Sequence, residues 1–414
     1  MRKLGNIPAT WSVAKLGDIA RVTSGGTPSR KEPSYWGGNV PWVSTGLIDF
    51  NTIHEVDEYI TSNGVDNSSA KVFPKGTVLM AMFGQGVTRG KVARLGMDSA
   101  FNQACVAIVP KNGLSQEYLF QYLRHHYNDI RGLSNSGSQA NLNAALIKSI
   151  SVVIPTKEEI REIVHLAKLW DQHIQETTRL LKLKRRLKRG LMQQLLTGRR
   201  RFPKFAGQHW KEVRIGEVLS EQFRPVTWDD AATYRLASVR RNSKGLFWRE
   251  ALKGSQIAVK KLHSIRAGDF LMSHIQAAYG AMAIVPTDFD GGHVLDMYTI
   301  LSPRHSDDFD VRFFGYLAER AEMKHAAYVS SNGFFAERLR LNFDPHDFLR
   351  RKIEIPPTLA EQQKIVAVLA AADREINLLE QQLAALREQK KGLMQKLLTG
   401  QIRLNGEMSS RERK

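Results

Sequence analysis

The strongest constraint on this sequence is an internal repeat. Residues Pro155–Gly198 align without a gap onto Pro357–Gly400, at an offset of 202 residues. Between positions 155 and 201 there are 19 identities with the second copy, and the match is densest where Lys188–Gly198 aligns with Lys390–Gly400. A solenoid has a period of about 20 to 50 residues, so this much longer period means that each copy carries a domain with it. The sequence therefore predicts a pseudo-dimer on a single chain.

The repeated segment has the pattern of a long helix. A proline precedes each copy and a glycine follows Leu-Leu-Thr at its end, which are the usual start and C-cap signals. Apolar residues recur every seven positions in two rows, which predicts a coiled-coil seam. In the second copy these rows are Ile365, Ala372, Leu379, Leu386 and Leu393, and Leu369, Ile376, Leu383 and Leu397 with an interruption at Lys390. In the first copy they are Ile160, Ala167, Ile174, Leu181 and Leu195, and Ile163, Trp170 and Leu191.

Neither helix can bury its apolar stripe alone. Each could pack on its own domain, or the two could pack against each other. The length of the heptad pattern favours mutual packing. The residues that we expect at helix and partner contacts are Leu181, Leu191, Leu195, Leu379, Leu386 and Leu393.

Two globular segments precede the helices and resemble each other weakly. Trp11–Ile19 matches Trp210–Val218, and both segments end in an apolar strand before the proline. Because apolar runs of strand length alternate with helical patterns, we expect a mixed α/β fold in each. We expect domains at 1–154 and 202–356, repeat helices at 155–201 and 357–401, and a polar tail at 402–414.

The charge balance points to a polyanionic partner. The 414 residues include 60 Lys and Arg against 41 Asp and Glu, a formal net charge of +19. Nucleic acid, an acidic membrane surface, or a basic surface without a specific partner all fit this balance. The single cysteine, Cys105, excludes an internal disulfide and is expected to be buried. No signal sequence and no run of about 18 apolar residues occurs, so we expect a soluble, cytoplasmic protein.

A glycine-rich segment, Gly84–Lys91, fits neither a phosphate-binding loop nor a dinucleotide fingerprint. Lys91 is followed by Val92 where a phosphate-binding loop needs Ser or Thr, and a strand follows where a dinucleotide site needs a helix. We predict a hairpin between Val78–Met82 and Lys91–Leu95 with Gln85, Thr88 and Arg89 exposed. Ser273–Tyr279 is its counterpart in the second domain.

A second polar loop, Ser134–Asn141, has its counterpart in Ser330–Arg338. Gln can pair with adenine and Arg with guanine, so such loops suit contact with DNA, although ordinary solvated turns have the same composition. The candidate DNA-binding residues are Gln85, Thr88, Arg89, Lys91, Ser134, Asn135, Ser138, Gln139, Asn141, His274, Gln276, Tyr279, Ser331, Asn332 and Arg338.

The sequence contains no recognisable catalytic, metal or cofactor motif. Asp344–Phe348 is only superficially similar to an amino-methyltransferase motif, because it lacks the second proline and the aromatic residue after it. We therefore expect a noncatalytic chain that binds neither metal nor cofactor. We expect the basic stretch at 182–189 to contact phosphate groups or an acidic surface of a partner protein.

Three signatures together resemble the specificity subunits of Type I restriction-modification systems. They are Gly25–Ser29 followed by Tyr35–Trp42, the strand that ends in proline before each helix, and the twice-used Gly-Leu-Met-Gln-x-Leu-Leu-Thr-Gly helix end. The likeness covers essentially the whole chain. The second domain lacks the first signature and begins instead with Glu221–Pro225, so residue-by-residue transfer is weaker there.

The resemblance implies two target-recognition domains, each reading one half of a bipartite, asymmetric sequence in double-stranded DNA. It implies that the two long helices lie antiparallel as a spacer and dock two modification (methyltransferase) subunits. S-adenosylmethionine is expected on those partners, and ATP and magnesium on the partner subunits of the complex, including the restriction (translocase and nuclease) subunits. No membrane partner is implied. A free-standing sequence-specific DNA-binding protein, a coiled-coil scaffold, a repressor-like protein and an enzyme with an unfamiliar site stay as alternatives.

Overall fold

The computed structural model describes residues 7–84, 87–134, 141–332 and 342–404, and divides the chain into two compact units. Unit 1 comprises Met1–Thr178 and Gln381–Lys414, and unit 2 comprises Arg179–Glu380. Each unit thus holds one globular head and about half of each of the two long helices. Head 1 belongs to unit 1 and head 2 belongs to unit 2. The two copies of the sequence repeat therefore do not coincide with the two compact units. Each unit contains part of the long helix from the other copy.

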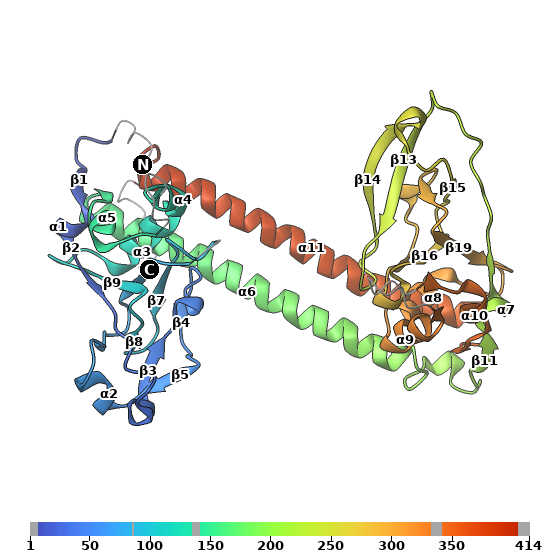
Figure 1. The fold of residues 1–414 in the computed structure, drawn as a ribbon, viewed down its shortest axis with the longest axis horizontal. Helices are drawn as coiled ribbons and strands as arrows, with labels where there is room; N and C mark the ends of the chain where they lie inside the picture. Colours follow the sequence, from blue (N-terminus) through green and yellow to red (C-terminus); the bar gives the residue numbers. More distant parts are fainter. Residues whose placement is uncertain (1–6, 85–86, 135–140, 333–341, 405–414) are drawn as a thin grey trace, which may run out of the picture. The chain divides into compact units, whose positions relative to one another are not determined.

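Head 1 is built on a five-stranded sheet with the order β2-β9-β6-β7-β4 (Figure 1). A three-stranded sheet, β5-β3-β8, lies beside it in the head, and β1 pairs antiparallel with β10. The strands are β1 Ser12–Lys15, β2 Ala20–Ser24, β3 Trp36–Val43, β4 Thr52–Ile53, β5 Glu58–Ile60, β6 Val78–Ala81, β7 Val92–Leu95, β8 Ala100–Phe101, β9 Cys105–Pro110 and β10 Ser151–Ile154. The short helices are α1 Leu16–Ile19, α2 Ser62–Asp66, α3 Gln116–His125, α4 Tyr127–Gly132 and α5 Ala144–Lys148.

Head 2 repeats the central part of this topology, with the sheet order β12-β19-β16-β17. A second sheet, β14-β13-β18-β15, accompanies it, and β11 pairs with β22 as β1 does with β10. The strands are β11 Lys211–Arg214, β12 Leu219–Glu221, β13 Thr233–Val239, β14 Leu246–Lys253, β15 Leu262–Ser264, β16 Phe270–Ser273, β17 Met282–Ile284, β18 His293–Leu295, β19 Tyr298–Pro303, β20 Ser331–Asn332, β21 Asn342–Phe343 and β22 Lys352–Ile355. The helices are α7 Ile215–Val218, α8 Val311–Ala318, α9 Ala321–Val329 and α10 Pro345–Arg350.

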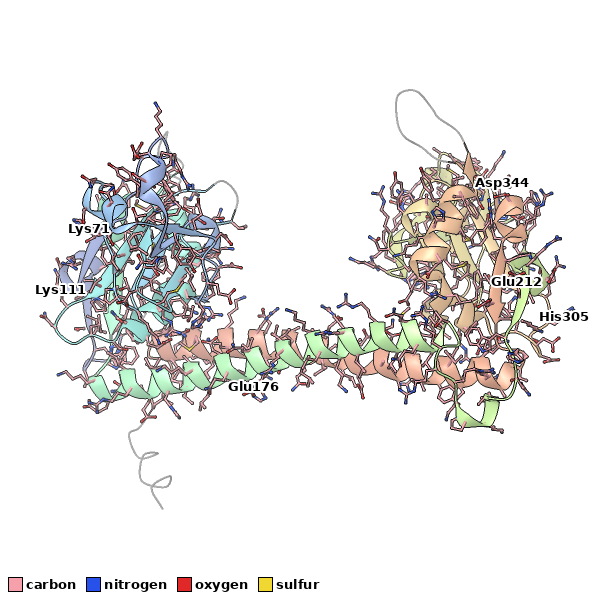
Figure 2. All side chains as sticks on the ribbon, turned by 90° about the horizontal axis from the view of Figure 1, so that it is seen from below. Lys71, Lys111, Glu176, Glu212, His305 and Asp344 are labelled. Carbon is pink, nitrogen blue, oxygen red and sulfur yellow. The ribbon has the colours of Figure 1, made fainter. Side chains whose placement is uncertain are left out.

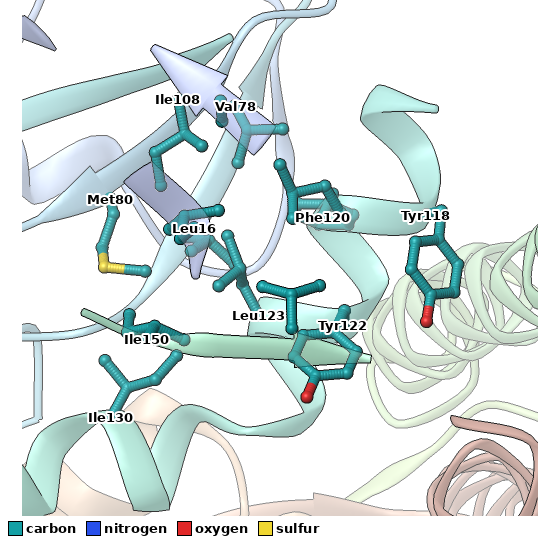
Figure 3. Packing of buried hydrophobic residues seen from close by; sticks show 14 of the residues in the cluster. Leu16, Val78, Met80, Ile108, Tyr118, Phe120, Tyr122, Leu123, Ile130 and Ile150 are labelled. Carbon is teal, nitrogen blue, oxygen red and sulfur yellow. The ribbon is translucent and has the colours of Figure 1, made fainter. Parts of the chain in front are cut away.

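The core of head 1 forms where α3 packs on the sheet (Figure 3). Leu119 and Leu123 are fully buried, together with Val78 and Ile108 of the strands. The two tyrosines of α3 are also buried, and their hydroxyls donate to backbone carbonyls of β10: Tyr118 to Val153 and Tyr122 to Ser151. Burial is tolerated because each hydroxyl has an acceptor, and burial raises the pKa of Tyr122 to about 12. The strand before the long helix is thereby fixed to the head.

The two repeat helices are α6 Lys157–Leu195 and α11 Leu359–Leu398. Gly198 and Gly400 follow them with positive φ of 67° and 73°, so the expected left-handed C-caps are confirmed. A β-carbon on Gly400 would also lie 2.5 Å from Pro8, which leaves no room for a larger residue.

Within each unit the beginning of one long helix meets the end of the other, so the two run antiparallel. In unit 1, Ile160 and Ile163 of α6 share a core with Met394 and Leu397 of α11 and with the head. In unit 2 the same arrangement recurs, with Leu195 of α6 beside Ile365 of α11. The helices therefore pack both on each other and on a head, so the two arrangements that the sequence left open occur together.

The heptad rows are buried unequally. The row of Leu369, Ile376, Leu383 and Leu397 is buried throughout, and the apparent interruption, Lys390, is itself buried. Among the six leucines expected at helix contacts, Leu181, Leu195 and Leu386 are buried and the other three are half-buried.

An equivalent clamp joins the two long helices within each unit. In unit 1 the Glu159 carboxylate accepts from Trp11 Nε1 at 2.7 Å and from Arg403 Nε at 2.8 Å. In unit 2 the equivalent Glu361 accepts from Arg201 Nε at 2.9 Å and Nη2 at 2.6 Å, with Trp210 Nε1 at 3.5 Å. The three partners are repeat mates, and in each clamp the Arg follows the end of one helix while the Glu lies in the first turn of the other. The repeat thus encodes the antiparallel register chemically as well as by apolar packing.

Candidate nucleic-acid interface

The described segments that flank the two polar loops of head 1 adjoin in the structure. β6 and β7 pair antiparallel, so the predicted hairpin is confirmed. The segment after the second loop returns to the hairpin, where the Leu142 backbone amide donates to the Met82 carbonyl at 3.0 Å. The hairpin is held from the side by Tyr127, whose hydroxyl donates to the Val87 carbonyl and accepts from Arg131 Nη1 at 2.7 Å. A single loop cluster results, supported by α4.

The candidate residues of head 1 differ in accessibility. The prediction that Arg89 is exposed is wrong, because its side chain is buried under the hairpin and its Nε has no hydrogen-bond partner among the described residues. Lys91 forms an ion pair with Asp49 at 2.6 Å, and Ser134 is buried and donates to the Arg131 carbonyl at 2.9 Å. Thr88 is half-buried and Asn141 is exposed. Gln85, Asn135, Ser138 and Gln139 lie outside the described residues.

In head 2 the described segments that flank the two loops meet through the equivalent backbone contact. β16 and β17 form the counterpart hairpin, and the Phe343 amide of β21 donates to the His274 carbonyl at 2.9 Å. β20, which contains Ser331 and Asn332, pairs with β21 and so borders this hairpin. The Ser331 hydroxyl donates to the Ala327 carbonyl at 2.7 Å, whereas Arg338 lies outside the described residues.

The candidate hairpin side chains of head 2 range from half-buried to exposed. Tyr279 is 46% exposed and Gln276 is half-buried. His274 is half-buried, with Nε2 at 2.8 Å from Thr299 Oγ1, and burial lowers its pKa. The imidazole is thus a neutral hydrogen-bonding group at neutral pH and adds no charge.

A third loop, which the sequence analysis did not select, joins this cluster. It is the turn from Arg240 to Gly245 between β13 and β14, and its Asn242 amide donates to the Tyr279 carbonyl at 2.9 Å. Arg241 is exposed; its guanidinium lies 5.0 Å from the centre of the Tyr279 ring, and its Nε donates to Gln276 Oε1 at 3.3 Å. The sequence Arg240-Arg-Asn-Ser-Lys-Gly245 does indicate a basic turn. Its contact with the hairpin could not be predicted, because the two segments are distant in the sequence.

The basic stretch of α6 has partners within the chain. Lys184 pairs with Glu375 at 2.7 Å, and Arg185 pairs with Glu380 at 2.6 Å, both on α11. Lys188 pairs with Asp373 at 2.7 Å. These three residues were expected to contact phosphate or an acidic partner surface. In the structure they instead form ion pairs with acidic residues of α11.

The other chemical candidates have structural roles. Cys105 is buried and burial raises its pKa to about 12, as expected for a thiol without nucleophilic character. Asp344, on head 2 in Figure 2, caps α10 by accepting from the His346 amide at 2.9 Å. Within the described ranges no group of three or more His, Cys, Asp or Glu residues is placed to hold a metal ion. Among the helices of the described residues, none is both long and apolar enough to cross a membrane.

Comparison with known proteins gives a consistent result. A family model described as the Type I restriction modification DNA specificity domain matches residues 8–185. The Type I restriction enzyme MjaIX specificity subunit of Methanocaldococcus jannaschii is 24% identical, and the alignment covers 97% of this chain and 95% of that protein. The EcoR124I/EcoR124II specificity subunit of Escherichia coli is 25% identical over 38% of this chain and 40% of its own length.

Two solved structures share the fold. The crystal structure of a Type I restriction-modification S subunit from M. genitalium matches with a TM-score of 0.58 at 13% identity, covering 96% of this chain and 98% of that one. A chain from a structural study of complex assembly and conformational transition of the Type I R-M system matches with a TM-score of 0.58 at 19% identity, covering 96% and 100%. At these identities the likeness establishes the architecture of two mixed α/β heads with two long helices.

Proposed function

We propose that this chain is a specificity subunit of a Type I restriction-modification system, as its similarity to such subunits supports, and that each head reads one half of a bipartite, asymmetric DNA target. The observation that carries this proposal is that in both units the segments flanking the two polar loops meet through an equivalent backbone hydrogen bond, from Leu142 to Met82 and from Phe343 to His274. The loops are equivalent in place but different in side chains. Two different half-sites follow from that difference.

In head 2 the readout centres on Arg241, Gln276 and Tyr279. Arg241 and Gln276 carry the groups that pair with guanine and adenine edges in the major groove. The Tyr279 ring beneath the guanidinium restricts its orientation and thereby lowers the entropy lost on binding a base. Head 1 contributes Thr88, Asn141 and the part of its hairpin next to them.

Arg241→Ala is expected to weaken binding to the half-site of head 2 by about 1–3 kcal/mol, because a side chain that pairs with a base is lost. Recognition of the other half-site is expected to stay unchanged. The measurement is the affinity of the purified chain for duplexes in which each half-site is altered in turn. Arg249→Ala, an exposed arginine on β14, serves as the control. Equal loss from both variants would show general charge attraction instead of readout.

The long helices are proposed to dock two modification subunits. Leu180, Leu183 and Leu187 are 43%, 52% and 53% exposed on α6. Their spacing of i, i+3 and i+7 places them on one face, and such an exposed apolar face is typical of a protein interface. In the assembled complex the partners hold S-adenosylmethionine, ATP and magnesium and carry out methylation, translocation and cleavage, while this chain selects the sequence without catalysis of its own.

The decisive test of this function is modification-sensitive sequencing of the host genome with and without the gene. Loss of N6-methyladenine at one bipartite motif would establish sequence selection and identify both half-sites. If instead the methylation pattern is unchanged while the partner subunits are expressed and active, the proposed function is refuted.

A further inference from the structure

A partly buried lysine–aspartate pair between the two long helices is repeated in the two units. In unit 1 Lys390 of α11 lies 2.6 Å from Asp171 of α6. In unit 2 Lys188 of α6 lies 2.7 Å from Asp373 of α11. Both residues of the second pair are the repeat mates of the first at the offset of 202. Lys390 is only 5% exposed, so its charge depends on its immediate neighbours.

The third charged partner has opposite sign in the two units. In both cases it is the ninth residue after the N-cap of a head helix: Arg124 of α3, after Ser115, and Glu319, the C-cap of α8, after Asp310. Arg124 Nη1 lies 3.1 Å from Asp171, and Lys188 lies 3.2 Å from Glu319. In unit 1 two cations share one carboxylate, whereas in unit 2 two carboxylates share one cation.

The pKa values of the two lysines follow this difference. Burial and repulsion by Arg124 lower the pKa of Lys390 to about 8, despite the attraction of Asp171. Burial acts in the same direction on Lys188, but Glu319 and Asp373 outweigh it and raise the pKa. The cluster of unit 1 therefore carries an excess of positive charge, and an added anion would stabilise it.

A cavity opens beside this excess charge. Its volume is about 280 Å³, and Gln121, Arg124, Arg387, Lys390 and Lys391 line it. Arg387 is exposed, and Lys391 is 71% exposed with only a long contact of 3.7 Å to Glu388, so both can turn toward a ligand. His125 also borders the cavity, but burial and its neighbour His126 lower its pKa to about 4, so it is neutral.

Residues that contact the hairpin of head 1 also line the cavity. Tyr127, which holds the hairpin through Val87, lines the cavity together with Phe50. The Phe50 amide donates to the Val92 carbonyl at 2.9 Å, so Phe50 is tied to the strand that leaves the hairpin. A DNA strand at the hairpin is thus adjacent to the cavity.

We propose that this cavity of unit 1 binds a phosphate group, with Lys390 and Arg124 at its buried end and Arg387 and Lys391 at its rim. The proposal rests on the proposed function, in which head 1 lies on DNA, and assigns the phosphate to the DNA backbone at the half-site of head 1. Free inorganic phosphate carries the same chemistry and is the other source that the experiment must separate.

The first measurement is the salt dependence of DNA binding by the full chain, with a duplex that carries the bipartite target. Arg387→Gln with Lys391→Gln is expected to reduce the slope of log affinity against log salt by about 1, since each phosphate contact contributes about 0.9. Discrimination between target and altered half-sites is expected to stay, because neither residue touches a base. The matched control is Arg185→Gln with Arg189→Gln, the repeat mates in unit 2, which are expected to leave the slope unchanged.

The second measurement is titration of the DNA-free chain with inorganic phosphate. If the variant with Arg387→Gln and Lys391→Gln loses phosphate binding but keeps the wild-type salt slope, the phosphate site is confirmed and its ligand is free phosphate. If the variant changes neither quantity, or if the control lowers the slope equally, the proposal is overturned. Failure of the proposed function would appear separately, as a wild-type chain without preference for any half-site. Both rim side chains are exposed, so folding is expected to be unaffected, and circular dichroism checks it.

Discussion

Glu361→Ala is expected to lower the free energy of unfolding of unit 2 by about 3–5 kcal/mol, because removal of one partner of a buried ion pair leaves the other charge uncompensated. Glu361 is 1% exposed, and Arg201, which it binds through two oxygens, is 14% exposed. Trp210 loses its acceptor at the same time. Hydrogen exchange under mild denaturant, resolved by segment, measures this loss in unit 2.

The repeat provides the matched control for this prediction. Glu159→Ala removes the same group from unit 1, but Arg403 is 43% exposed and water can solvate it after the change. The loss of stability in unit 1 is therefore expected to be clearly smaller. Equal losses in the two units would contradict the assignment of the larger cost to the buried arginine.

Leu183→Glu combined with Leu187→Glu is expected to abolish most methylation by the assembled complex while DNA binding by the chain is retained. Each leucine is more than half exposed, so the helix itself does not need it. A central interface leucine contributes about 1–2 kcal/mol, so two together, about 2–4 kcal/mol, correspond to a loss of about 30- to 1,000-fold in affinity for the partner. The measurements are co-purification with the modification subunit and methylation of target DNA.

A control for added charge is Gln172→Glu with Gln175→Glu, at exposed polar positions on the same helix. These changes are expected to leave docking unchanged. If the leucine variant assembles normally, the apolar face of α6 is not the docking surface, although the recognition of DNA by the heads would be unaffected by that result.

Much of the architecture could be predicted from the sequence because it depends on local or repeated signals. The heptad rows predicted α6 and α11, and the positions of Gly198 and Gly400 predicted their ends, since these signals act through neighbouring residues in the chain. The hairpin of head 1 was predicted from its glycines. The exposure of Arg89 was predicted wrongly because burial depends on what packs over a turn.

The candidate interface was only partly predictable. The segments that flank the two selected loops adjoin in each head, but in head 2 the turn of Arg241 joins them through a contact with Tyr279, 38 residues later in the chain. The basic stretch of α6 was assigned to an outside partner, whereas Glu375 and Glu380 of α11 neutralise part of it. Charge patterns in a sequence do not tell which charges meet inside the fold.

By itself the sequence determined that one unit is used twice, that each use ends in a long amphipathic helix, and that the chain is strongly basic. Only the tertiary structure decided that each compact unit takes half of each helix, that Glu159 and Glu361 lock the antiparallel register, and that a third residue, Arg124 or Glu319, gives the clusters at Lys390 and Lys188 opposite net charges. The physical reason is the range of the interactions. Helix periodicity and caps act over a few residues, whereas an ion pair or a cavity requires groups that lie far apart in the chain to come within a few ångströms, which only the folded chain brings about.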